Sequence, residues 1–498
     1  MSAVSCQTDS ITGTSGNTGS RGSLPATLAE VDSSCRTSVL LLVFSGLGWL
    51  LVGLLLSVVN NIKLLNPDFL NQCAWITLGR LRAVELNVYV YGFATELALG
   101  IVLWLICRLS QTRLVSESVI NAAAIFWNLG LTLGIGGILA GESTGIRYLE
   151  LPRFCTPILF VSFVLIGGWT WVAFQNRKQR TTYASQWYLL GAVLWFPWVF
   201  SAAQLLLVLG ASRGVVQSAV GGWYAHNLIG LWLTPVALGA IYYFLPLILG
   251  RPIHGYSLSR VGFWTLAVFS GWAGVRNLVG GPLPAWMITV SVVSSVLMLI
   301  PVLVIAMNHL RTLVGHLGEV FRNTTLRFLA VGALSFALSN LLAIFTSFRS
   351  VSAVSQFTYW VEAQSLLALY GFVGMTLLGS IHFILPKLTQ KEWPCRGMQS
   401  VHFWFSVLGI FLMVIPLLWG GWLQGKALLN PKTPFLEVVQ ATVPYLRLRT
   451  AGSLVFLLGQ LAFLGNLLWM IVQALLSCCP FEIPGLAKCS SIPSTPGK

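Results

Sequence analysis

The sequence has 498 residues, of which 56% are hydrophobic and only 9% are charged, and its mean hydropathy is +0.80. These values exclude an ordinary soluble protein and indicate a polytopic membrane protein. The net charge of +15 does not indicate a nucleic-acid partner, because the basic residues are spread over short segments between apolar runs.

Residues 1–37 are rich in serine, threonine and glycine, so they predict a disordered cytoplasmic tail. Residues 38–477 contain apolar runs of roughly 20 residues, the length that crosses a bilayer core. Because helices satisfy their own backbone hydrogen bonds in lipid, the runs predict an all-α polytopic membrane domain of twelve transmembrane helices. Residues 478–498 are expected to form a short C-terminal tail. The runs begin near residues 39, 86, 119, 155, 188, 224, 261, 286, 328, 363, 403 and 452.

The orientation follows from the basic residues of the loops. They are more frequent in the two tails and in every second loop than in the remaining loops. This bias predicts that both termini are cytoplasmic. The longest predicted loops, 61–85 and 424–450, then lie on the opposite face, where they cap the bundle or meet a partner protein.

The most informative run is the sixth, where an apolar helix carries His226 followed directly by Asn227. An imidazole in hydrocarbon costs free energy unless it is hydrogen-bonded or binds a metal. Two interpretations therefore remain open on chemistry alone, a metal ligand and a histidine that packs against a neighbouring helix.

Further motifs surround this histidine in other runs. In chain order they read Gly79-Arg80-Leu81-Arg82, Trp223-Tyr224-Ala225-His226-Asn227, Tyr242-Tyr243-Phe244-Leu245-Pro246, Trp272-Ala273-Gly274, Leu385-Pro386-Lys387 and Pro444-Tyr445-x-x-x-Arg449. In this order and spacing, from residue 79 to the last helix, they resemble subunit I of cbb3-type cytochrome c oxidases, members of the haem-copper oxidase superfamily. The resemblance implies a twelve-helix bundle with two haems and one copper in a bacterial cytoplasmic (inner) membrane.

The same resemblance places the metal-ligand histidines of the family, and this sequence replaces most of them. His226 matches a copper ligand. Arg276 and Asn277 stand at the other two copper positions, Gln364 at the ligand position of the high-spin haem, and Glu85 and Leu366 at those of the low-spin haem. Ser270 stands where the family carries a redox tyrosine.

Two more positions carry expectations. Arg449 matches an arginine that contacts haem propionates in the family, although an arginine at the start of a helix also anchors the membrane interface. Glu85 is expected to be a helix-end glutamate that faces the headgroups rather than a haem ligand.

An arginine in an apolar helix is costly unless it is paired. We therefore expect Arg276 to contact a carboxylate from Glu362, Glu85 or Glu96, and we expect His226, Asn277 and Gln364 to share the same cavity.

With five of the six ligand positions altered, the sequence predicts a protein that binds neither haem nor copper, with His226 unmetallated and no catalytic residue. Such a protein serves as a non-catalytic subunit or partner in a respiratory complex, beside a cytochrome c-type protein or another oxidase subunit. The alternative is an active haem-copper terminal oxidase, or a nitric oxide reductase, that passes electrons from cytochrome c to oxygen with atypical ligands. A transporter or proton path through the emptied cavity is a third interpretation, which no coupling motif favours.

Overall fold

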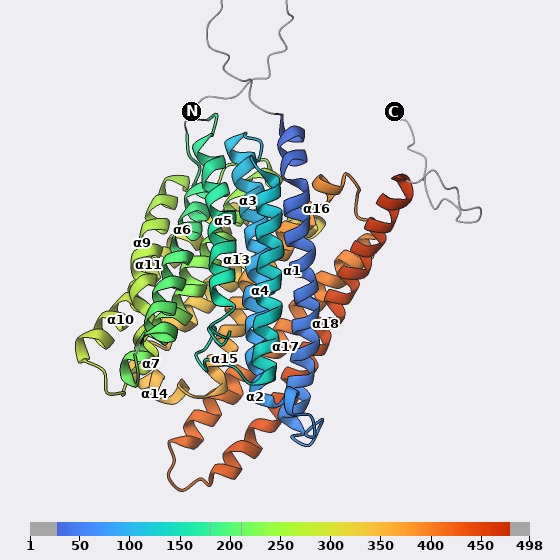
Figure 1. Cartoon of the computed structure of the whole chain (residues 1–498). Coiled ribbons are helices and arrows are strands. Elements are labelled where there is room, and N and C mark those ends of the chain that lie inside the picture. The colour runs from blue at the N-terminus through green and yellow to red at the C-terminus, as the bar shows by residue number, and fades with distance from the viewer. Residues whose placement is uncertain (1–26, 180, 211, 479–498) are drawn as a thin grey trace, which may run out of the picture.

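The computed structural model describes residues 27–179, 181–210 and 212–478, and all regular structure in this part of the chain is helical. Eleven helices there are long and apolar enough to cross a membrane. A twelfth span is formed by α9 (Ser259–Trp272) and the 3₁₀ segment η6 (Ala273–Leu278), which continue each other. The spans pack side by side in one bundle (Figure 1). The prediction of an all-α membrane protein with twelve spans is confirmed.

The remaining spans are built from single helices or from helices joined end to end. In chain order they are α1 (Leu28–Leu65); α2 (Leu78–Asn87), η2 (Val88–Ala94) and α3 (Thr95–Ser110); α4 (Glu117–Ala140); α5 (Thr156–Gln175); α6 (Ala184–Ala203) and η3 (Gln204–Leu209); α7 (Val215–Asn227), η4 (Leu228–Leu233) and α8 (Thr234–Leu249); α10 (Ala285–Leu297) and α11 (Leu299–Leu313); α13 (Thr324–Phe345); α15 (Tyr359–Leu366), η7 (Leu367–Gly374) and α16 (Met375–Thr389); α17 (Arg396–Leu428); and α18 (Phe435–Cys478). The short elements between spans are η1 (Ala74–Ile76), η5 (Tyr256–Leu258), α12 (Leu317–Arg322) and α14 (Arg349–Ser355).

Four of the composite spans contain a π-helical segment, and in three of these, η2, η4 and η7, the segment follows a residue at a metal-ligand position of the resemblance. The segments η2, η4 and η7 begin within three residues after Glu85, His226 and Leu366, respectively. π-Helical turns are rare and occur frequently at functional sites. The backbone irregularity therefore coincides with the positions that the resemblance assigns to metal ligands.

The predicted tail boundary at residue 37 is wrong, because α1 already begins at Leu28. A capping box starts the helix: the Thr27 hydroxyl accepts a hydrogen bond from Glu30 N, and the Glu30 carboxylate accepts one from Thr27 N at 3.1 Å. The rest of that predicted tail, residues 1–26, and the predicted C-terminal tail after Cys478 lie outside the described residues.

The prediction of long loops at 61–85 and 424–450 is also wrong in extent. Helix α1 continues to Leu65 and α2 begins at Leu78, while α17 ends at Leu428 and α18 begins at Phe435. Figure 1 shows α17 and α18 extending past the other spans at the end of the bundle opposite the start of α1 and the last turn of α18. Hydropathy marks only the stretch that crosses the hydrocarbon, whereas a helix continues for as long as its backbone hydrogen bonds are made.

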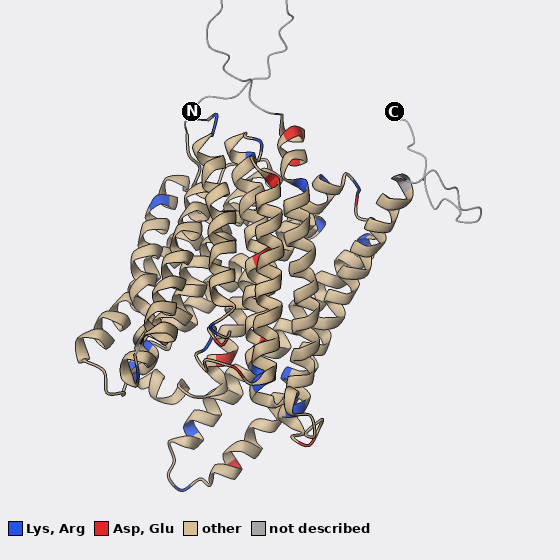
Figure 2. Ribbon diagram, in the orientation of Figure 1, with Lys and Arg blue, Asp and Glu red and all other residues tan. Residues whose placement is uncertain are grey.

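Charge and hydrophobicity divide the surface into zones. Lysine, arginine, aspartate and glutamate gather towards the two ends of the bundle, and the belt between them is nearly uncharged (Figure 2). Large apolar side chains such as Leu205, Trp264 and Trp419 are more than half exposed. Exposed apolar surface of this extent indicates contact with lipid.

Candidate functional site

A central cavity of about 830 Å³ lies between spans six, seven and ten. It is lined by His226 from α7, Arg276 and Asn277 from η6, and Gln364 from α15. These are the four residues that the sequence places at the copper and high-spin haem positions. The structure therefore brings them together around one space.

His226 occupies the last turn of α7, beside Ser270 of α9. A Cβ atom added at Gly230 would collide with Ser270 Oγ and would lie 3.8 Å from His226 Nε2, so both side chains lie against the same point of η4. Neither of these two atoms has a hydrogen-bond partner among the described residues, and both are buried. The imidazole is therefore held by packing rather than by a hydrogen-bonded neighbour.

Arg276 is only 8% exposed. Its Nη1 donates to Ser295 Oγ at 3.2 Å and to the Ala273 carbonyl at 3.4 Å, and Nε is buried without a partner among the described residues. No ion pair joins Arg276 to a described carboxylate. The expected pairing with Glu362, Glu85 or Glu96 is therefore wrong.

Each of those three carboxylates has other partners. Glu96 accepts a hydrogen bond from the Ser45 hydroxyl of α1. Glu85 accepts one from Asn60 Nδ2 of α1 at 2.7 Å and is only 8% exposed, so the prediction that it faces the headgroups is wrong. The reason in both cases is the polar side chain that α1 places opposite the carboxylate.

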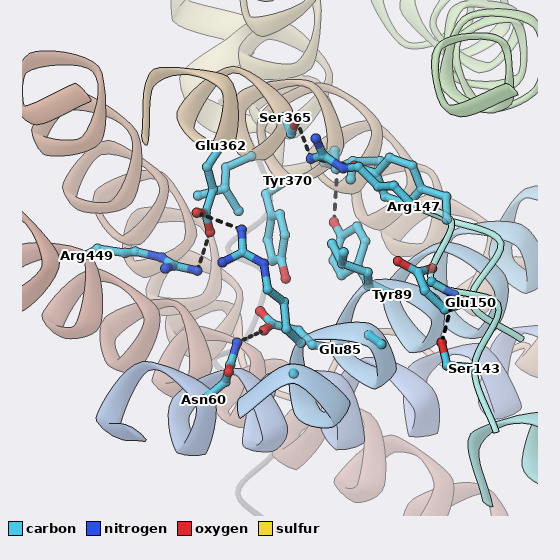
Figure 3. Close-up of a pocket in the computed structure, with 18 residues that line it drawn as sticks. Asn60, Glu85, Tyr89, Ser143, Arg147, Glu150, Glu362, Ser365, Tyr370 and Arg449 are labelled. Carbon is cyan, nitrogen blue, oxygen red and sulfur yellow. Dashed lines mark hydrogen bonds and ion pairs between the residues drawn. The ribbon is translucent and has the colours of Figure 1, made fainter. Parts of the chain in front are cut away.

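Glu362 pairs with two arginines. Its carboxylate lies 2.6 Å from Arg449 Nη2 and 3.1 Å from Arg82 Nη2, and the side chains of Arg449 and Glu362 are mostly buried. Figure 3 shows Glu362 and Arg449 pointing toward each other across the edge of a second pocket. Arg449 lies well inside α18, which begins at Phe435, so the alternative of an anchor at a helix start is wrong.

This second pocket, called the Glu362 pocket below, has a volume of about 380 Å³. Glu85 and Leu366, which stand at the two low-spin haem positions, both line it. Tyr89 and Tyr370 also line this pocket, and their rings stack at a centroid distance of 4.1 Å (Figure 3). Residues 364 and 366 thus face different spaces, the central cavity and the Glu362 pocket, as the resemblance implies for the two haem positions.

The donors around these spaces do not fit the cofactors of the family. Both irons and the copper require imidazole nitrogen. Leu366 has no donor atom, the Glu85 carboxylate is hydrogen-bonded to Asn60, and Gln364 offers an amide. On the copper side a single imidazole stands beside a guanidinium, which cannot ligate and repels a cation.

The sequence did not single out Glu150, which lines the Glu362 pocket from the loop between α4 and α5. Burial raises the pKa of this carboxyl to about 7, although a 2.8 Å hydrogen bond from Asn87 Nδ2 lowers it. The features that point to Glu150 lie in this same loop. The loop carries Glu142, Arg147 and Glu150 within nine residues, and Tyr148 has a left-handed φ of 61°.

Two other histidines also lie between helices. His382 Nε2 and His402 Nδ1 are 3.0 Å apart, and His402 Nε2 lies 3.1 Å from Gln460 Oε1. These contacts join α16, α17 and α18, so both histidines support the packing of these helices.

Comparison with known proteins identifies the family. The model of the family described as Cytochrome C and Quinol oxidase polypeptide I matches residues 37–455. The chain belongs to this family. It is 27% identical over 462 residues to the cytochrome c oxidase subunit 1 homolog of Azorhizobium caulinodans, covering 88% of this chain and 82% of that protein. It is also 27% identical over 442 residues to the cbb3-type cytochrome c oxidase subunit CcoN1 of Stutzerimonas stutzeri, covering 86% and 92%.

A more distant relative is the cytochrome c oxidase subunit 1 of Thermus thermophilus, 25% identical over 288 residues, or 51% of this chain and 50% of that protein. The resemblance predicted from the motifs is confirmed, and the protein is a cbb3-type cytochrome c oxidase subunit I-like membrane protein.

Proposed function

We propose that this subunit I-like protein carries neither haem nor copper and acts as a non-catalytic membrane component of a respiratory complex. The observation that supports this most is the side-chain set of the two cofactor spaces. Glu85 and Leu366 face the Glu362 pocket, and Gln364, Arg276 and Asn277 face the central cavity with His226 as the one imidazole.

Electrostatics supports the same proposal. Copper in the central cavity would lie beside the Arg276 guanidinium, and like charges in a medium of low dielectric constant repel strongly. In the Glu362 pocket, Arg449 already has a carboxylate at 2.6 Å, so the arginine that would hold a haem propionate is engaged within the protein.

We further propose a bacterial cytoplasmic membrane as the location, with both termini in the cytoplasm. A cytochrome c-type protein or another oxidase subunit is the proposed partner. The even number of spans supports placing both termini on one side, and the basic residues of the loops support the cytoplasmic side.

The test is the cofactor content of the purified protein. We expect the pyridine haemochrome assay and elemental analysis for copper to give no stoichiometric signal, and the Soret band to be absent. Stoichiometric haem b would overturn the proposal and favour an active oxidase or nitric oxide reductase with atypical ligands.

A reverse experiment uses the triple variant Glu85→His, Gln364→His and Leu366→His. We expect it to gain Soret absorbance, because it restores imidazole to both iron positions. The single variant Leu366→His is the matched control, since it restores only one of the two low-spin ligands and leaves the high-spin position without imidazole. A triple variant that folds and gains no absorbance would contradict the assignment of these positions.

A further inference from the structure

The charges that line the central cavity do not balance. Among the described residues, Arg82, Arg147 and Arg276 contribute three cations to its wall, and Glu362 is the one carboxylate there. That carboxylate is already shared by Arg82 and by Arg449 of the neighbouring pocket. Arg82 and Arg147 are exposed to solvent, so Arg276 is the one buried cation among the described residues of this wall, and no described carboxylate pairs with it. A buried cation without a counter-charge attracts anions.

Arg276 is the deepest of these cations, and its hydrogen-bonding capacity is only partly used. Nη1 contacts one hydroxyl and one carbonyl, both at 3.2 Å or more. Nε and Nη2 have no partner among the described residues. Unused N–H donors on a cation suit the oxygen atoms of a carboxylate or a related oxyanion.

Neutral donors accompany the arginine. Asn277 and Gln364 line the same cavity, and no hydrogen bond involves their side-chain amides among the described residues. Each amide offers two N–H donors. The cavity that Arg276 lines therefore also offers neutral donors.

The cavity is also accessible. Its lining includes exposed residues such as Ser218 and Phe357, the second of which is 87% exposed. A small solute can therefore reach the space from the end of the bundle where α7 and α14 lie, which is opposite the start of α1 (Figure 1).

From these observations we propose that the central cavity binds a small oxyanion of the carboxylate type, with Arg276 as the charged ligand and Asn277 and Gln364 as neutral donors. The bound anion supplies the counter-charge that this arginine lacks within the protein. The site goes beyond the proposed function, because it concerns the lining of the cavity whether or not the Glu362 pocket holds a haem.

The test measures the thermal unfolding midpoint of the purified full-length protein in detergent while sodium formate replaces sodium chloride at constant ionic strength. We expect the midpoint to rise and to saturate with formate, because a ligand that binds only the folded state stabilises it. The Arg276→Gln variant should need at least tenfold more formate for half-saturation, and Arg276→Lys should be intermediate because it keeps the charge but loses the planar guanidinium.

Two variants serve as controls. Arg311→Gln removes an exposed arginine of α11 that does not line the cavity and should respond as the unaltered protein does. Asn277→Asp places a carboxylate beside Arg276 within the chain, and we expect it to abolish the formate response while the protein stays folded. This second variant keeps the proposal testable if Arg276→Gln does not fold.

An unaltered protein that shows no formate response, or an Asn277→Asp variant that responds fully, would overturn the proposal. So would chloride acting as well as formate. Haem and copper analysis of the same samples separates this outcome from the proposed function, because cofactor content and the formate response are read independently.

Discussion

Two buried arginines occupy the two cofactor spaces of this fold, and they differ in what surrounds them. Arg449 lies 2.6 Å from the carboxylate of Glu362, whereas Arg276 contacts only a hydroxyl and a carbonyl. In the Glu362 pocket an arginine is thus in contact with a carboxylate, whereas in the central cavity Arg276 forms no ion pair with a described carboxylate. The two spaces therefore differ in whether a carboxylate of the protein neutralises the buried arginine.

The difference shows what each space retains. Arg449 matches an arginine for which the resemblance implies contact with a haem propionate, and here the Glu362 carboxylate supplies a negative charge beside it. The copper site of the family is cationic, and here Arg276 brings a positive charge to the position of one of its ligands. In each space, the charge that this protein supplies therefore has the same sign as the cofactor charge that the resemblance implies there, although the metal ligands have changed.

The largest expected change in stability comes from breaking the ion pair between Glu362 and Arg449. Glu362→Gln leaves Arg449 buried without a carboxylate, and removing one partner of a buried ion pair costs about 3–5 kcal/mol of stability. We expect a large drop in the thermal unfolding midpoint of the purified protein.

The matched control is Glu437→Gln, since Glu437 is exposed and forms no ion pair among the described residues. The double variant Glu362→Gln with Arg449→Gln should recover part of the loss, because it removes the unpaired cation as well. Equal unfolding midpoints for Glu362→Gln and Glu437→Gln would show that the ion pair does not stabilise the fold.

Much of this arrangement could be predicted from the sequence. The apolar runs predict the spans because length and hydrophobicity suffice to cross a bilayer. The motif spacing predicts that His226, Arg276, Asn277 and Gln364 share one cavity, since the order and packing of the helices belong to the family.

The partners of the charged residues could not be predicted in this way. The bond from Asn60 to Glu85 depends on how α1 turns against α2, and the sequence holds no motif for that contact. Two residues correspond to about 200° around a helix, an angle that by itself would direct Glu362 away from Gln364. Both nevertheless line the wide central cavity, and Glu362 also reaches the pocket behind it.

Glu150 and Glu362 are both mostly buried carboxyl groups, but they have different partners. Glu150 accepts a hydrogen bond from an amide, whereas Glu362 pairs with two arginines. The pKa of Glu150 is about 7 in the folded protein and 4.5 as the ordinary value. Below about pH 4.5 the group is protonated in both states and costs nothing. As the pH rises to about 7 the unfolded state ionises first, so stability falls by about 3 kcal/mol.

Glu150→Gln should remove this decline, so that the difference in unfolding midpoint between variant and unaltered protein grows between pH 5 and pH 7.5. Glu142→Gln, in the same loop but exposed, is the control. A difference that does not change with pH would show that Glu150 is ionised throughout this range in the folded protein.

The smallest change in stability is expected from substituting Arg276, and this change is a gain rather than a loss. Arg276→Met removes a buried cation that no described carboxylate neutralises and keeps most of the side-chain volume, so it should stabilise the protein by about 1–3 kcal/mol in the absence of a binding anion. The measurement is the unfolding midpoint in chloride buffer, compared with Arg449→Met. The latter should destabilise, because it strands the Glu362 carboxylate with only the half-exposed Arg82 as a partner. If both methionine variants lost stability equally, Arg276 would have a partner as good as that of Arg449, and the contrast between the two spaces would not hold.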